Sequence, residues 1–150
     1  MNALVVYDSV YGNTEEIARS IGGAINGDVK VLGAGEVNIS ELDSFDLIVV
    51  GAPTYGGRPT PAMQEFLKKI PDTAIKGTSV ATFDTRFTAK WVKVFGFAAG
   101  RIARILKRKG GNIITSPEGF FVEGTKGPLK EGEVERAARW AKETVLSKCQ

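Results

Sequence analysis

Two stretches of the sequence, residues 3–7 (ALVVY) and residues 45–53 (FDLIVVGAP), are apolar over the length of a β-strand, apart from Asp46 near the start of the second. Runs of this kind, without polar alternation, are typical of parallel strands buried on both faces of a sheet. Parallel strands need long crossover connections, which are usually helices. The two runs therefore predict an α/β protein if helical patterns lie between its strands.

Helical patterns do separate the expected strands. Further strands are predicted at residues 29–34, 78–83 and 111–116, and apolar residues recur with a helical period after Thr14, after Pro61 and along residues 131–148. This alternation indicates right-handed βαβ units and a doubly wound parallel sheet. We expect one domain, residues 1–150, because the length suits a single core and no linker or repeat is evident.

The composition excludes several kinds of chemistry. The chain has no histidine and a single cysteine, Cys149. Ser-His-Asp and Cys-His catalysis, an internal disulfide and the common zinc sites are therefore ruled out, and redox chemistry needs a bound cofactor. No run approaches the roughly 20 apolar residues of a membrane span, and the first residues lack a signal-peptide pattern, so we expect a cytoplasmic protein.

The loop after the first expected strand, residues 8–14 (DSVYGNT), is rich in hydroxyl groups. In a doubly wound sheet, ligands bind beyond the carboxyl ends of the strands. Gly12 lets the backbone approach a ligand closely, Ser9, Tyr11 and Thr14 offer hydroxyls, and the amides that open the next helix form an anion nest. The loop predicts a phosphate monoester site built from neutral donors.

Other phosphate-binding motifs are absent. No GxxxxGK[ST] sequence occurs, and residues 33–38 (GAGEVN) carry Asn38 where the dinucleotide motif needs its third glycine. The first loop lacks the cysteine of low-molecular-weight tyrosine phosphatases. The third strand ends in GAPTYGG and not in the aspartate of a response-regulator receiver.

Two stretches resemble the flavodoxin family. YDSVYGNTEEIA is similar to that family's phosphate-binding loop, and VVGAPTYGGRP is similar to its loop after the third strand. The resemblance implies FMN as the cofactor. It also implies a flavodoxin-like, doubly wound, five-stranded parallel sheet of order 2-1-3-4-5 with helices on both faces, in the short form of the fold.

The resemblance implies roles for individual residues as well. The first loop would hold the FMN phosphate, Tyr55 would stack on the isoalloxazine, and a carbonyl of Gly56 or Gly57 would turn towards flavin N5. Phe87 would either stack on the flavin or pack inward, and Asp8 would point away from the phosphate and bond the turn backbone. The expected cofactor contacts are Ser9, Val10, Tyr11, Gly12, Asn13, Thr14, Pro53, Thr54, Tyr55, Gly56, Gly57, Asp84, Thr85, Arg86 and Phe87, of which Asp84, Thr85 and Arg86 would meet the pyrimidine edge.

The charge pattern departs from typical flavodoxins, which are strongly acidic. This chain has a net charge of +3 and gathers eight basic residues between Arg86 and Lys109, with no acid between Asp84 and Glu118. On a helix, one face would carry Lys90, Lys93, Arg101, Arg104, Lys107 and Arg108, with Phe97 among them, and the other Trp91, Phe95, Ala98, Ile102, Ile105 and Leu106. Residues 88–96 would instead form a loop near the flavin if the helix starts later.

The basic segment has two interpretations. It is either an ordinary solvated helix face or a docking site for an acidic redox protein, for NAD(P)H or for an anionic membrane surface. Nucleic acid is not expected, since no recognised binding fold accompanies the charge.

Together these features predict an FMN-binding electron-transfer flavoprotein with an acidic redox partner. Arg86 would bring positive charge to the flavin and make its second reduction step less negative than in a typical flavodoxin. One alternative is an FMN-dependent NAD(P)H oxidoreductase acting on a quinone or another small acceptor, with residues 118–132 as a wall above the flavin. In the carrier, that segment would be a loop with Phe120 and Phe121 in the sheet edge or core. A flavin-free interaction module is the other alternative, and the oligomeric state is left open.

Overall fold

A computed structural model describes residues 1–87 and 97–149 of the chain. The predictions for Lys90, Trp91, Lys93 and Phe95 lie outside the described residues.

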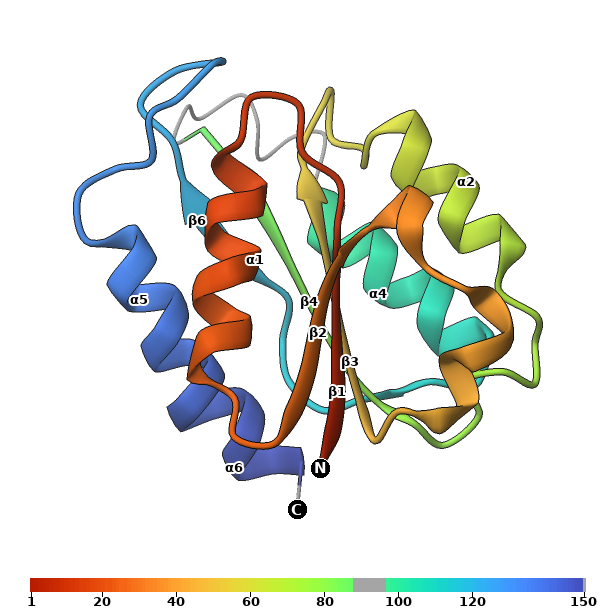
Figure 1. Ribbon diagram of the computed structural model, residues 1–150. Helices are drawn as coiled ribbons and strands as arrows, with labels where there is room; N and C mark the ends of the chain where they lie inside the picture. The colour runs from red at the N-terminus through yellow and green to blue at the C-terminus, as the bar shows by residue number, and fades with distance from the viewer. Residues whose placement is uncertain (88–96, 150) are drawn as a thin grey trace.

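A parallel sheet of order β2-β1-β3-β4-β5 forms the centre of the fold, and β6 also pairs with β4 (Figure 1). Each neighbouring pair is parallel. This topology confirms the predicted α/β fold class and strand order. The strands that fill the first four positions are β2 (Asp28–Gly33), β1 (Asn2–Tyr7), β3 (Leu47–Pro53) and β4 (Ser79–Arg86).

The sheet edge beside β4 consists of two short strands. β5 (Asn112–Ile113) pairs with Ser79 and Val80 of β4, and β6 (Glu118–Phe121) pairs with Phe83–Arg86. The continuous strand predicted at residues 111–116 is therefore wrong in length. β6 was missed because Glu118 and Gly119 interrupt the apolar pattern, and its pairing with β4 comes from residues more than thirty positions away in sequence.

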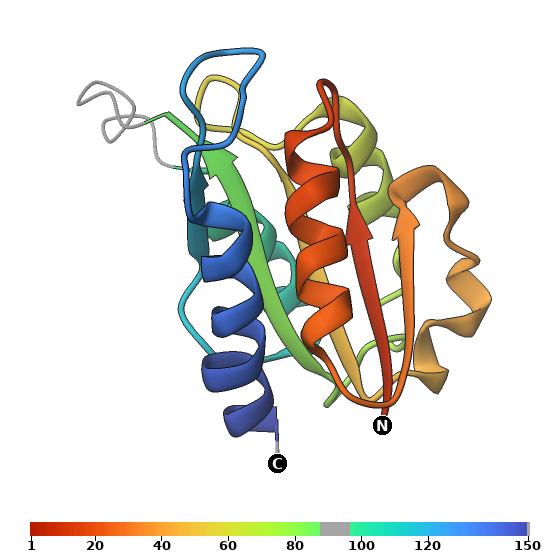
Figure 2. The same ribbon diagram turned by 60° about the vertical axis from the view of Figure 1, so that its left-hand side comes forward.

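Helices cover both faces of the sheet (Figures 1 and 2). On one face lie α1 (Asn13–Ala24) and a C-terminal helical stretch, which comprises α5 (Glu133–Arg139), the π-helical turn η3 (Trp140–Val145) and α6 (Leu146–Cys149). On the other face lie α2 (Pro61–Lys69), α4 (Ala98–Arg108) and the 3-10 helices η1 (Ala34–Glu36) and η2 (Ile39–Ser44).

The predicted helical stripes face the core, with one difference at the C-terminus. Ile17 and Ile21 of α1 and Met63, Phe66 and Leu67 of α2 are buried, as are Ala137, Ala141 and Val145. Val134 and Ala138 are only half-buried, whereas Trp140, which was not predicted, is buried. Its ring meets Phe120 edge-on at 5.9 Å between centroids, and Phe120 meets Phe83 at 6.2 Å. Three aromatic rings thus anchor β6 in the core.

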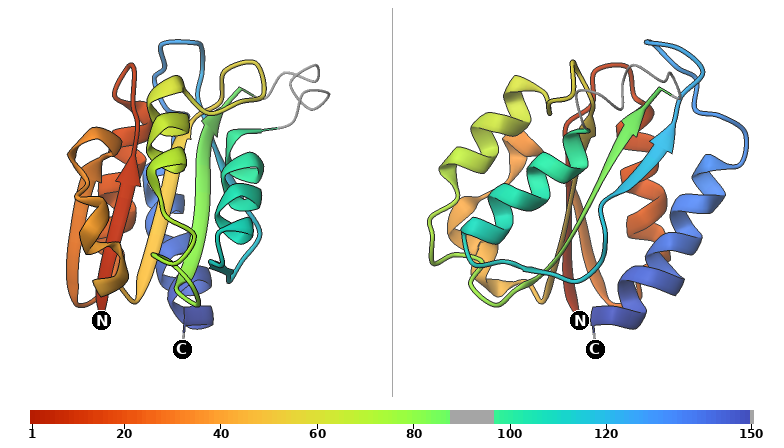
Figure 3. Two further views of the ribbon diagram at one scale, coloured as in Figure 1. Left: turned by 90° about the vertical axis from the view of Figure 1, so that its right-hand side faces the viewer. Right: turned by 180° about the vertical axis from the view of Figure 1, so that it is seen from behind.

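The parallel direction of the strands brings their carboxyl ends to one edge of the sheet, at the top of Figures 2 and 3. The chain termini lie at the opposite edge. The loops after β1, β3, β4 and β6 therefore converge at the edge where ligands bind in doubly wound folds. No helix in residues 1–87 and 97–149 has the length and apolarity to cross a bilayer.

Gly51 offers a test of the sheet's packing. A Cβ at position 51 would overlap the ring of Phe83 on the neighbouring strand β4. Because overpacking a close-packed core is costly, Gly51→Ala should destabilise the fold by about 1–3 kcal/mol in urea unfolding. Gly23→Ala is the matched control, since a Cβ there meets nothing within 4 Å and alanine favours helix α1 by up to about 1 kcal/mol. Equal stability of Gly51→Ala and the parent chain would contradict this packing.

Candidate functional site

A cleft opens at the carboxyl edge of the sheet. All of the expected cofactor contacts except Gly12 and Asp84 line it, and Val122 and Thr125 join them. The lining residues come from the loops after β1, β3, β4 and β6. The structure therefore brings the predicted residues together, while their contact with a cofactor stays a prediction.

Exposed apolar surface is concentrated in this cleft. Across the described residues, the exposed large hydrophobic side chains are Met1, Val10, Tyr11 and Tyr55. The last three line the cleft and are 52%, 47% and 39% exposed. Partial burial, and secondarily the nearby Tyr11 and Asp8, raise the pKa of the Tyr55 phenol, which is therefore neutral at physiological pH. Flat apolar groups left open beside polar donors are typical of a ligand site.

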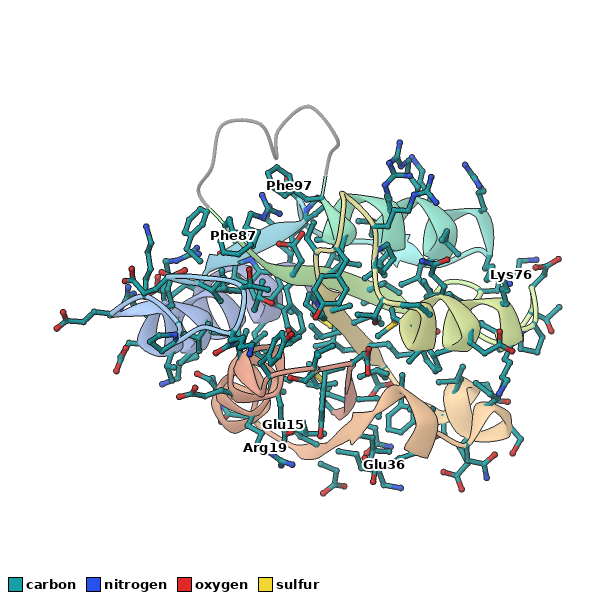
Figure 4. All side chains as sticks on the ribbon, turned by 90° about the horizontal axis from the view of Figure 1, so that it is seen from above. Glu15, Arg19, Glu36, Lys76, Phe87 and Phe97 are labelled. Atoms are coloured by element: carbon teal, nitrogen blue, oxygen red, sulfur yellow. The ribbon has the colours of Figure 1, made fainter. Side chains whose placement is uncertain are left out.

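The loop after β1 is shaped by Gly12. Its φ of 92° is readily available only to glycine, and its N–H donates to Ser9 Oγ at 3.0 Å. Helix α1 begins at Asn13 with no side-chain cap on its N-terminus, so its first amides remain available to an anion. Glu15 and Arg19 on α1 pair with each other at 2.8 Å (Figure 4) and do not line the cleft.

Asp8 does not bond the turn backbone as predicted. Its carboxylate accepts a hydrogen bond from the hydroxyl of Thr60, which is buried just before α2. A hydroxyl from a distant segment therefore satisfies the acid. The contact ties the first loop to the start of α2.

Thr14 and Thr85 meet across the floor of the cleft. Their hydroxyl oxygens lie 2.8 Å apart, and both residues are almost fully buried. One hydroxyl must donate to the other, so the pair has one proton left to offer a ligand. A residue of the predicted phosphate loop is thus hydrogen-bonded to one predicted to meet the pyrimidine edge.

The Asp84 side chain faces helix α4, which corrects its predicted role at the pyrimidine edge. The carboxylate is fully buried and accepts from the Ala99 N–H at 2.9 Å and from Arg86 at 2.6 and 2.8 Å. Thr54 hydrogen-bonds it as well. Burial raises the pKa of Asp84, and the bonds from Arg86 and the Ala99 N–H limit the rise. Asp84 therefore positions Arg86 and the start of α4 but does not line the cleft itself.

Arg86 is held between an acid and a ring. Besides its two bonds to Asp84, its guanidinium lies 3.5 Å from the centroid of the Phe97 ring. Phe97 is half-buried under this cation and is not a freely exposed aromatic. Figure 4 shows Phe87 and Phe97 on the side of the molecule away from Glu15 and Arg19. Because Asp84 balances its charge, Arg86 brings less positive potential to the cleft than an unpaired arginine.

The loop after β3 is a tight turn that lines the cleft and also contacts helix α4. Tyr55 and Arg58 exchange backbone hydrogen bonds of 2.8 and 2.9 Å, and Gly56 and Gly57 between them have φ values of 55° and 79°. Tyr55, Gly56 and Gly57 line the cleft. The Gly57 carbonyl accepts from Arg101 Nε of α4 at 2.6 Å. Since Gly57 is already bound in this way, Gly56 is the better candidate for the carbonyl predicted to face flavin N5.

The segment after β6 contributes to the lining of the cleft, a role that the sequence analysis left undecided. Val122 and Thr125 line the cleft, whereas Phe120 lies in the core and Phe121 is half-buried in β6. Glu133 fixes this segment by accepting from the Phe121 N–H and from Arg136, all at 2.8 Å. The bonds from Arg136 lower the pKa of Glu133. Val122 and Thr125 carry no sequence motif, and only the pairing of β6 with β4 reveals them.

The predicted basic face exists on α4. Arg104, Lys107 and Arg108 are exposed and Arg101 is half-buried, whereas Ala98, Ile102 and Leu106 are buried, as the helical pattern predicts. Two other members of the basic segment are engaged elsewhere. Arg86 pairs with Asp84, and Lys109 donates to the Ile70 carbonyl at 2.6 Å.

The fold and cleft define a class of protein: a doubly wound α/β domain whose cleft combines a hydroxyl-rich loop with exposed aromatic rings. A family model described as "Flavodoxin domain" matches residues 4–109. The chain belongs to this family.

Individual relatives agree with this membership. The chain is 27% identical over 106 residues to a flavodoxin of Picosynechococcus sp., covering 69% of this chain and 62% of that protein. It is 32% identical over 98 residues to a flavodoxin of Clostridium beijerinckii, covering 61% and 70% respectively. The first match thus spans less than two thirds of the Picosynechococcus flavodoxin.

Solved structures share the fold. A flavodoxin from the domain Archaea superposes with a TM-score of 0.82 at 23% identity, over 100% of both chains. Flavodoxin 1 of Bacillus cereus superposes with a TM-score of 0.76 at 21% identity, over 94% of this chain and 95% of that one.

The buried ion pair beneath the cleft gives a pH-dependent prediction. Arg86→Gln leaves the Asp84 carboxylate buried without its partner, which should cost about 3 kcal/mol in urea unfolding at neutral pH. It also raises the pKa of Asp84 further above its ordinary value. The folded variant then keeps a proton that the unfolded chain has lost, so its stability should fall as pH rises from about 5 to about 8.

The double variant Arg86→Gln with Asp84→Asn is the control, because it has no carboxyl group to titrate at this position. It should lose the added pH dependence. A destabilisation of Arg86→Gln that is constant over this range would show that Asp84 stays ionised without Arg86.

Proposed function

We propose that the chain is an FMN-binding electron carrier. The observation that carries the proposal is the concentration of exposed Val10, Tyr11 and Tyr55 in a cleft next to the uncapped N-terminus of α1. A flavin mononucleotide has the matching parts, since its flat ring suits the aromatic side chains and its phosphate suits amides and hydroxyls. Membership of the flavodoxin domain family supports the same cofactor.

The donor set of the cleft fits this group. Ser9, Tyr11, Asn13 and Thr14 line its phosphate end, and a Cβ built on Gly12 meets nothing within 4 Å, so the loop has open space in front of it. FMN, when bound, supplies the redox chemistry by taking up and giving back electrons singly or in pairs. The protein's own part is to bind the phosphate, orient the ring and keep one edge of the cleft accessible.

Other residues of the cleft contact the flavin ring. Tyr55 stacks on the ring, Gly56 offers a backbone carbonyl, and Thr85 and Arg86 face the pyrimidine edge. Because Asp84 neutralises Arg86, the second reduction step should shift by less than an unpaired guanidinium would cause. The exposed basic face of α4 supports an acidic redox protein as the partner.

An FMN-dependent NAD(P)H oxidoreductase is the second candidate, because Val122 and Thr125 line the same cleft as Tyr55. Two measurements separate the possibilities. The visible absorption spectrum of the protein with added FMN, followed by gel filtration, shows whether the cofactor is retained. Steady-state NADPH oxidation with a quinone then distinguishes an enzyme, which turns over, from a carrier, which does not.

Tyr55 provides the residue-level test of FMN binding. Removing the ring by Tyr55→Ala should weaken FMN binding about tenfold, equivalent to about 1.4 kcal/mol of stacking. Fluorescence quenching of FMN on titration measures the dissociation constant. Tyr55→Phe keeps the ring and should bind nearly as tightly as the parent chain. If Tyr55→Ala binds FMN as well as Tyr55→Phe does, the aromatic ring has no stacking role.

A further inference from the structure

Four arginines line a groove that shares no lining residue with the cleft. Arg101, Arg104 and Arg108 come from α4, and Arg58 comes from the turn after β3. Pro59, Gln64 and Ile105 complete the lining. Arg58 was not part of the basic segment predicted from sequence, because it lies forty residues before the start of α4. We call this set of four the arginine groove.

The arginine groove holds more positive charge than the described residues around it neutralise. Arg58, Arg104 and Arg108 are exposed, and none of them has an ion pair with a carboxylate in residues 1–87 and 97–149. The sequence of α4 contains no acid at all. Like charges held this close repel one another, so the arrangement gains stability when an anion enters it.

The spacing on α4 favours an extended anionic surface. Arg101, Arg104 and Arg108 recur at i, i+3 and i+7, which places them along one side of the helix over about 10 Å. Guanidinium groups bind carboxylates through two parallel hydrogen bonds, which lysine does not offer. A row of carboxylates on a protein surface therefore matches this row of guanidinium groups.

A small phosphate ligand fits the groove less well. Compact phosphate sites use backbone amides at a helix N-terminus, as the loop after β1 does. Arg104 and Arg108 lie in the C-terminal half of α4, where the helix dipole is negative. Side chains alone therefore supply the attraction, which suits several separated charges better than one concentrated anion.

The groove and the cleft share a wall. Tyr55 lines the cleft and Arg58 lines the groove, and the two residues are joined across one tight turn by a pair of backbone hydrogen bonds. Arg101 lines the groove and donates to the carbonyl of Gly57, which lines the cleft. A protein bound in the groove therefore lies next to the edge of the proposed flavin site, as electron transfer between two proteins requires.

We propose that the arginine groove docks a carboxylate-rich surface of an electron-transfer protein. This deepens the proposed function and rests on it. The docking charge lies on α4 and the turn after β3, and not on the phosphate-binding loop.

The test uses a fluorescein-labelled helical peptide with glutamates at i, i+3 and i+7 as the probe. Arg104→Glu with Arg108→Glu reverses two exposed groove charges and leaves Arg101 bound to Gly57. Lys142→Glu with Lys148→Glu is the matched control. It makes the same change in net charge at exposed positions of the C-terminal helical stretch, on the opposite face of the sheet (Figure 3).

Fluorescence anisotropy should show at least about tenfold weaker peptide binding by the groove variant and a change of less than about twofold in the control. Binding by the parent chain should weaken between about 20 mM and about 200 mM salt, because surface charges are screened. Equal weakening in both variants would assign the attraction to net charge and overturn the proposal. Displacement of the peptide by NADPH, with NADPH binding lost in the groove variant, would make the groove a nucleotide site and also overturn it.

Measuring the peptide on FMN-free and FMN-loaded protein separates this proposal from the proposed function. Both variants should retain FMN like the parent chain, since neither changes a residue lining the cleft. Failure to retain FMN in the parent chain would refute the carrier. Failure of the FMN-free protein to bind the peptide selectively would refute docking at the groove.

Discussion

The geometry of the cleft depends on one buried carboxylate. Asp84 accepts hydrogen bonds from Arg86 on its own strand and from the Ala99 N–H in the first turn of α4. Thr54 hydrogen-bonds Asp84 and also accepts from the Ala98 N–H at 3.0 Å. An acid without these partners would be too costly to bury. The loops after β3 and β4 and the start of α4 are therefore fixed relative to one another by its need for donors.

The same constraint explains why the proposed flavin site and the arginine groove are neighbours. Asp84 and Thr54 hold the N-terminus of α4, and Arg101, one turn further along, reaches the Gly57 carbonyl. The turn after β3 is thus fixed at two points. Thr54 connects it to Asp84 at the end of β4, and the Gly57 carbonyl connects it to Arg101 of α4. Moving α4 would move both surfaces together, because Thr54, Asp84 and the Gly57 carbonyl are all hydrogen-bonded to it.

Much of the fold could be predicted because its signals are local. The apolar runs of β1 and β3 and the helical stripes of α1, α2 and α4 each lie within one continuous segment. The loop after β1 and the turn after β3 were recognisable for the same reason, since glycines and hydroxyls stand together in sequence. β6, Val122 and Thr125 were missed because their positions follow from pairing with a strand far away in sequence.

Asp84 was misplaced although the sequence contained the relevant signal. Side chains alternate between the two faces along a strand, so Asp84 and Arg86 share one face while Thr85 takes the other. Thr85 accordingly meets Thr14 of α1, and Asp84 meets α4 on the opposite side. Ending the predicted strand at residue 83 concealed this alternation, because β4 continues to Arg86. Arg58 was overlooked for the opposite reason, since only the packing of the turn after β3 against α4 brings it to the other arginines.

Positive charge is concentrated in the arginine groove and not in the loop after β1. A bound flavin phosphate carries about two negative charges, which would reduce the net charge of +3 to about +1. Long-range attraction of an acidic partner by the loaded protein as a whole would then be weak. The loop after β1 offers neutral donors, so the proposed flavin phosphate would need no arginine, and the cations of the arginine groove would remain available to a partner. An acidic partner would therefore be oriented by this local cluster beside the cleft rather than by the protein's overall charge.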